Sequence, residues 1–157
     1  MVESVVPMEE VLATVAHGRE AWKIEAFTFV SEARAIGTRV IREEDCVGHF
    51  KNGFPKVLPG ALTLEMLCQV GVYTALKKFP GQVAILGNFS GRPLAPIFPG
   101  DELQMREELL EWKGRKGKAR GEAFVRGLKV FEAGLEFRVV RPEILQRPHA
   151  KPLEAAA

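Results

Sequence analysis

A histidine and a carboxylate lie close together in the sequence, on either side of a Pro-Gly pair. His49 lies in a loop rich in turn residues, and Glu65 lies near the start of an apolar segment that begins at Pro59-Gly60. Two such groups that face one cavity can divide proton transfer: one removes a proton from carbon while the other protonates a leaving oxygen. The same pair can also form a hydrogen bond that only neutralises a buried acid. The residue types therefore leave a catalytic pair and a structural pair as alternatives.

The start of the apolar segment adds a third chemical element. Proline is favoured at the beginning of a helix, and the free N–H of the next residue, Gly60, points outward at the positive end of the helix dipole. Such an N–H can bind a carbonyl oxygen that becomes negative during a reaction. A Pro-Gly pair can also begin a helix that binds nothing, so this signal is weak on its own. Gln69 follows Glu65 by one helical turn, which puts both side chains on one face.

The element that positions these groups is the segment from Gly60 to Leu76. It is apolar almost all round, which predicts one long buried helix. Burying an unpaired carboxylate is costly, so we expect Glu65 to be buried with a partner or a proton, and His49 is the nearest candidate in sequence. The segment is slightly short for a membrane span and contains Glu65, so we do not expect it to cross a membrane.

The remaining chain predicts a short helix and six strands. The helix covers residues 8–17, and two strands, at 22–30 and 35–42, precede the long helix. Four strands follow, at 82–89, 102–112, 119–125 and 128–140, joined by turn-rich segments. Because strands and helices do not alternate, we expect an α+β fold with an antiparallel sheet curved around the long helix. Four phenylalanines are most simply core residues, with the lining of a ligand tunnel as the alternative for some of them: Phe27, Phe29, Phe89 and Phe98.

Composition narrows the class of protein. The chain of 157 residues is long enough for one domain, which we place at 1–141, with a Pro-rich C-terminal extension at 142–157. A net charge of only +2 gives no global field that would favour nucleic acid. Cys46 and Cys68 have no metal-binding spacing, so we expect free thiols and no metal. No basic N-terminal stretch followed by an apolar run marks a signal peptide, and we expect a cytoplasmic protein.

The motif around the two candidate residues resembles a known active site. Gly48-His49-Phe50, Phe54-Pro55 and the run from Pro59-Gly60 through Glu65 to Gln69 resemble the active-site segment of the 3-hydroxyacyl-[acyl-carrier-protein] dehydratases. That family has a Gly-His-Phe-Pro loop, a Pro-Gly helix start, and a Glu or Asp one turn before a Gln. A second segment, from Arg92-Pro93 to Pro99-Gly100-Asp101, is similar to another signature of the family. The resemblance covers roughly residues 17–140.

The resemblance implies a fold, an assembly and a role for each residue. The family's "hot dog" fold wraps an antiparallel sheet around a long helix, and its members are dimers with shared sites, often assembled into hexamers. His49 of one protomer would take the proton α to the thioester, and Glu65 of the other would protonate the departing 3-hydroxyl. The Gly60 N–H would polarise the thioester carbonyl, with Phe50 and Ala61 also at the substrate site. The implied partner is acyl carrier protein, with no metal or other cofactor.

One departure from the family pattern keeps other functions open. The loop after His49 is longer than the family's, and Lys51 stands where proline is expected. A thioesterase or hydratase acting on coenzyme A thioesters, or a non-catalytic subunit that binds acyl chains, would fit the same architecture. The basic hairpin at 113–120 is either a solvated tip or a docking surface for an acidic carrier protein. His17 and His149 lack motif context and are expected on the surface.

Overall fold

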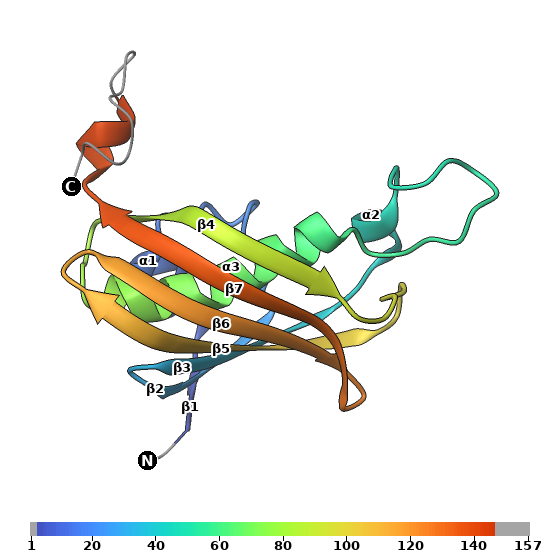
Figure 1. Cartoon of the computed structure of the whole chain (residues 1–157), viewed down its shortest axis with the longest axis horizontal. Helices are drawn as coiled ribbons and strands as arrows, with labels where there is room; N and C mark the ends of the chain where they lie inside the picture. The colour runs from blue at the N-terminus through green and yellow to red at the C-terminus, as the bar shows by residue number, and fades with distance from the viewer. Residues whose placement is uncertain (1–2, 147–157) are drawn as a thin grey trace.

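A computed structural model describes residues 3–146 of the chain. Seven strands form one antiparallel sheet in the order β1-β2-β3-β5-β6-β7-β4 (Figure 1). The strands span Ser4–Val6 (β1), Ala26–Ser31 (β2), Arg34–Val40 (β3), Val83–Pro93 (β4), Glu102–Lys113 (β5), Lys116–Val125 (β6) and Leu128–Val140 (β7). The helices span Met8–Thr14 (α1), Glu43–Cys46 (α2) and Gly60–Lys77 (α3), followed by a 3₁₀ helix at Pro142–Gln146 (η1).

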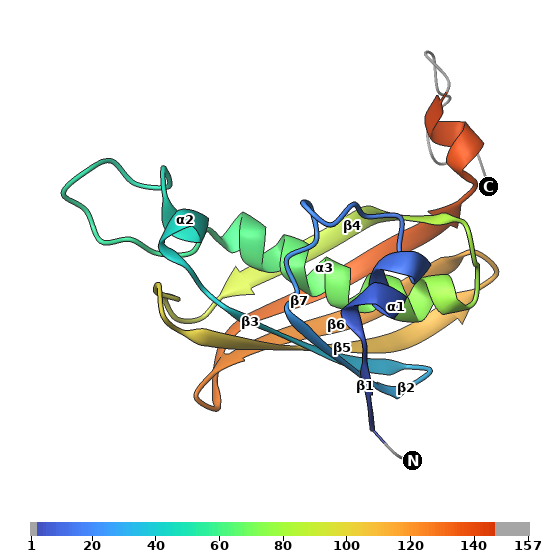
Figure 2. The ribbon, with the colours of Figure 1, turned by 180° about the vertical axis from the view of Figure 1, so that it is seen from behind.

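Helix α3 is the centre of the molecule, and the twisted sheet curves around one side of it (Figures 1 and 2). It begins directly after Pro59 and contacts β3 to β7. Its buried residues include Met66, Leu67, Val70 and Leu76, each without exposed surface. The predicted helix and the predicted wrapped arrangement are therefore confirmed. Among residues 3–146, no helix is both long enough and apolar enough to cross a membrane.

Helix α1 packs against α3 on the side that the sheet leaves open (Figure 2). Val11 is completely buried, and the Tyr73 hydroxyl of α3 donates a hydrogen bond of 3.0 Å to Glu10. The segment after α1 continues along α3 toward β2. This placement brings His17, Ala21 and Lys23, which are far from α3 in sequence, onto the face of α3 that carries Glu65 and Gln69.

Several predicted bounds differ from the structure for identifiable reasons. The strand expected from residue 22 begins only at Ala26, because the Lys23 N–H donates to the Gln69 side chain instead of a neighbouring strand. The short elements β1, α2 and η1 were not predicted. Phe89 and Phe98 are exposed rather than in the core, since Phe89 lies on β4, an edge strand of the sheet. The C-terminal extension from residue 147 onward, with His149, lies outside the described residues.

Candidate functional site

Glu65 lies in the second turn of α3 and is held there by Gln69. The Gln69 Nε2 donates to Glu65 Oε1 at 3.0 Å, as the one-turn spacing predicted. The prediction that Glu65 is buried is wrong: about half of its side chain is exposed, at 51%. The carboxylate therefore lies at an opening in the surface, where it can be reached from outside and needs no buried counter-ion.

Gln69 also ties α3 to the loop that precedes β2. Its side chain is buried, its Oε1 accepts from the Lys23 N–H at 2.7 Å, and its Nε2 donates to the Ala21 carbonyl at 2.9 Å. Because both backbone partners are satisfied by one amide, the orientation of that amide is fixed by the loop. The Nε2 hydrogen that remains points to Glu65, so the loop, the amide and the carboxylate form one hydrogen-bonded unit.

His17 belongs to the same site, although it was expected to be a simple surface residue. Its Nε2 lies 4.0 Å from Glu65 Oε1, and only 26% of its side chain is exposed. The ring packs edge-on against Trp22 with centroids 5.7 Å apart, and Nδ1 is buried without a hydrogen-bond partner. No residue spacing predicts this contact, since it depends on the loop that Gln69 holds against α3.

These residues stand at the mouth of a cavity of about 110 Å³ between α3 and the sheet. Its wall is mostly apolar and includes Val72, Ala84, Leu86, Leu135 and Phe137, with Cys68 beside Glu65 and Glu107 further in. Burial, and then the charges of Glu107 and Glu65, raise the pKa of the Cys68 thiol to about 12. The thiol therefore stays protonated at neutral pH, which leaves Glu65 and His17 as the groups at this mouth that can take part in acid–base chemistry.

The first turn of α3 presents free backbone donors, as Pro59-Gly60 predicted. Within the described residues, the N–H groups of Gly60 and Ala61 donate no hydrogen bond, whereas those of Leu62 and Thr63 donate to the Pro59 carbonyl. Gly60 is half-buried and Ala61 exposed. Two free donors at the positive end of an 18-residue helix suit an oxygen that gains negative charge.

His49 lies outside this mouth within a single chain. It is exposed and packs on Phe50, with ring centroids 4.5 Å apart. The loop that carries it extends past the first turn of α3, away from the body of the chain (Figures 1 and 2). Within the described residues no contact joins His49 to Glu65, so their pairing, expected between protomers, stays a prediction.

A buried ion pair anchors the start of the His49 loop. Arg39 on β3 forms a two-pronged contact with Asp45 in α2, with Nη2 2.7 Å from Oδ1 and Nε 3.2 Å from Oδ2. Both side chains are less than a tenth exposed. Burial raises the pKa of Asp45, but the hydrogen bond and charge of Arg39, with the Arg42 N–H, outweigh it and lower the pKa below its ordinary value. Asp45 is thus held ionised four residues before His49.

Comparison with known proteins decides the family. The chain is 34% identical over 140 residues to the curated 3-hydroxyacyl-[acyl-carrier-protein] dehydratase FabZ of Herpetosiphon aurantiacus, covering 85% of this chain and 97% of that relative. The chain belongs to the FabZ dehydratase family. No protein-family model matches it.

Solved structures agree with FabZ membership at the level of the fold. A dehydratase heterocomplex from Xenorhabdus doucetiae matches with a TM-score of 0.72 at 19% identity, over 87% of this chain and 95% of that one. A hot-dog-like protein from Thermanaerovibrio acidaminovorans matches with a TM-score of 0.63 at 20% identity, over 81% and 90%. Identities this low carry the fold alone, and they confirm the hot dog architecture.

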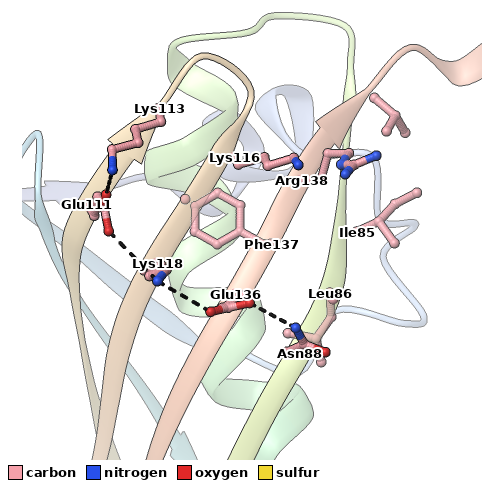
Figure 3. A pocket seen from close by; sticks show the side chains of 13 residues that line it. Ile85, Leu86, Asn88, Glu111, Lys113, Lys116, Lys118, Glu136, Phe137 and Arg138 are labelled. Atoms are coloured by element: carbon pink, nitrogen blue, oxygen red, sulfur yellow. Dashed lines mark hydrogen bonds and ion pairs between the residues drawn. The ribbon is translucent and has the colours of Figure 1, made fainter. Parts of the chain in front are cut away.

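A larger hollow of about 610 Å³ lies on the outer face of the sheet, beside the basic hairpin of this FabZ-family chain (Figure 3). Two of its three lysines are matched by carboxylates: Lys118 lies between Glu111 and Glu136, at 3.9 and 3.6 Å, and Lys113 contacts Glu111. Asn88 donates to Glu136 at 3.0 Å. The charges of Lys113 and Lys118 are thus compensated within the chain, so these two lysines do not add to the case for carrier-protein docking at the hairpin.

Proposed function

We propose that this chain dehydrates 3-hydroxyacyl thioesters to trans-2-enoyl thioesters, with acyl carrier protein as the thioester carrier in fatty-acid synthesis. The observation that carries the proposal is Glu65, fixed by Gln69 at the mouth of an apolar cavity, on the same helix as two free N–H donors. The FabZ relatives are named for this reaction. The location in the cytoplasm stays a prediction.

In the proposed reaction, His49 removes the proton from the carbon next to the thioester carbonyl. Negative charge then develops on the carbonyl oxygen, where the Gly60 and Ala61 N–H groups can stabilise it. Glu65 donates a proton as the bond between C3 and the hydroxyl oxygen breaks, and water leaves. The C2–C3 double bond forms from the electrons of the broken C–H bond, so atoms and charges balance within two proton transfers.

A shared site requires a second copy of the chain, and β4 is where we place it. This strand forms one edge of the sheet, and residues 87–93 are exposed along it, with 59% of Phe89 accessible. An exposed edge with an aromatic side chain is a template for pairing with another strand. Pairing of β4 with β4 of a second copy would bury this edge and continue the sheet across a two-fold axis.

The test is turnover of a 3-hydroxyacyl thioester on acyl carrier protein, followed by mass spectrometry of the enoyl product. We expect His49→Ala and Glu65→Ala each to lower the rate by at least about 100-fold, as for removal of a general acid or base. Wild-type turnover in either variant would overturn the assigned roles. Release of free thiol in place of enoyl product would identify a thioesterase instead. Co-purified lipid without any turnover would identify an acyl-binding subunit.

A further inference from the structure

Glu107 is a buried acid inside the cavity that the proposed reaction does not use. It lies on β5 with 6% of its surface exposed, and its Oε2 has no hydrogen-bond partner. No cation of the described residues pairs with it. Burial raises the pKa of this carboxyl well above its ordinary value, which favours the protonated, neutral form of the group. A neutral carboxyl offers one O–H donor and one carbonyl acceptor.

Three small residues next to Glu107 leave space for its carboxyl group. The neighbours of Glu107 in the sheet are Ala35 on β3 and Gly121 on β6. A Cβ on Gly121 would lie 2.9 Å from Glu107 Oε2, and a Cβ on Gly71 of α3 would lie 2.7 Å from Oε1. Any larger side chain at either glycine would push the carboxyl away. The space is therefore shaped to the acid from both the helix and the sheet.

The carboxyl lies on the same cavity wall as the catalytic candidate. Glu65 and Glu107 both line the 110 Å³ cavity, one at its mouth and the other further in. Gly71, which touches Glu107, follows Glu65 by six positions, or about 9 Å along a helix. With bonds of about 1.5 Å, a chain needs at least six bonds to span that distance. A group that reaches Glu107 is thus well separated from the reacting carbon.

A second buried polar atom without a partner belongs to a residue that lines a hollow together with Glu107. The Thr74 side chain is 6% exposed, and its Oγ1 has no hydrogen-bond partner. Thr74 and Glu107 together line a smaller hollow of about 10 Å³ that adjoins the main cavity through Gly71, Ala75 and Phe137. Buried polar atoms are normally hydrogen-bonded, so two unpaired atoms on residues that line one hollow mark a place where a polar group of a ligand would be satisfied.

We propose that Glu107 is a specificity-determining residue, and that it selects acyl chains carrying a second hydrogen-bonding oxygen, such as a hydroxyl, six or more bonds beyond the reacting carbon. The proposal rests on the proposed dehydratase function and names its substrate class. A hydroxyl can accept from the neutral carboxyl and donate to its carbonyl or to Thr74. A plain saturated chain would cover the same polar atoms and leave them unpaired, which disfavours its binding.

The experiment compares two substrates in one assay: a 3-hydroxyacyl thioester of about ten carbons, and the same thioester with a second hydroxyl near the far end of its chain. For the wild type we expect kcat/KM to favour the hydroxylated chain by at least about tenfold. Glu107→Gln keeps a neutral donor and acceptor and should keep the preference. Glu107→Leu should reverse it in favour of the plain chain. Because each preference is a ratio within one protein, partial misfolding of a variant cancels.

Equal preference in the wild type, or an unchanged ratio in Glu107→Leu, would overturn the proposal. Loss of the preference in Glu107→Gln would also contradict it, since that result would require an ionised carboxylate. A binding arm separates this proposal from the dehydratase assignment: calorimetry with a free saturated fatty acid of about ten carbons and its terminally hydroxylated analogue. If neither thioester turns over but the hydroxylated acid binds more tightly to the wild type only, the dehydratase function fails and the role of Glu107 stands.

Discussion

Gln69 is the residue on which the geometry of the candidate site depends most directly. One buried amide satisfies the Lys23 N–H and the Ala21 carbonyl and also holds Glu65. We expect Gln69→Leu to lower the free energy of unfolding by about 2–4 kcal/mol, because it leaves two buried backbone groups unpaired. Activity should fall as well, since Glu65 loses its hydrogen bond. Urea unfolding and turnover of the same preparations measure both effects.

The matched control is Glu65→Gln, which leaves the contacts of Gln69 to the loop intact. This variant should lose activity while its free energy of unfolding stays within about 0.5 kcal/mol of the wild type, as for a half-exposed side chain. If Gln69→Leu were as stable as the wild type, the loop would not be held by the amide. Gln69→Leu should lower both stability and activity, whereas Glu65→Gln should lower activity alone. Comparing the two variants thus separates the positioning role of Gln69 from the chemical role of Glu65.

For single residues, spacing in the sequence predicted some contacts but not others. The one-turn separation of Glu65 and Gln69 predicted their contact, because helix geometry alone brings such residues together. The approach of His17 to Glu65 could not be predicted, since it depends on a loop held by a hydrogen bond to a residue 46 positions away from Lys23. The burial of Glu107 could not be predicted, because a single glutamate in a strand with several charged residues carries no sign of burial in the sequence.

Among the elements, α2 is the short helix that leads into the loop of His49, and its anchor is the Arg39–Asp45 pair. Removing one member of a buried pair leaves the other charge uncompensated, so we expect Asp45→Asn to destabilise the protein by about 3 kcal/mol at neutral pH. The pKa of Asp45 is lowered in the folded state. Its contribution is therefore complete above the unfolded pKa of about 4 and is lost as the pH falls through the lower folded value.

The measurement is the difference in unfolding free energy between wild type and Asp45→Asn at a series of pH values. We expect a constant difference above about pH 4 that shrinks at more acidic pH. Glu132→Gln is the control, because Glu132 pairs with the exposed Arg92 and such surface pairs contribute about 1 kcal/mol or less. A difference that stayed constant down to strongly acidic pH would mean that the ion pair is not the anchor.

The boundaries of helices and strands were predictable where proline or glycine marks them. Pro59 and Pro80-Gly81 bracket α3 in the sequence, and the helix ends within a few residues of both. The start of β2 was not predictable, because Trp22 and Ile24 are buried and alternate like a strand while the Lys23 N–H bonds to a side chain. Burial on one side thus imitates a strand pattern where no strand partner exists.

For the whole molecule, one apolar helix and antiparallel strands were enough to predict the wrapped architecture, since few arrangements cover such a helix. The complete site could not be read from one chain. Glu65 lines the cavity within a protomer and Gly60 begins the same helix, whereas His49 lies on a loop that extends away from them. Whether a second chain supplies His49 is a question about assembly, and it has a direct test.

Subunit mixing tests the shared site. When His49→Ala and Glu65→Ala chains are unfolded together and refolded, random pairing makes half of the dimers mixed, and each mixed dimer holds one intact site and one doubly altered site. We therefore expect about a quarter of wild-type activity from two inactive parents. Sites built within single chains would give no recovery at all. Phe89→Lys in both chains should abolish the recovery and yield monomers in sedimentation, because it places a charge on the exposed edge of β4 where we expect the second copy to pair.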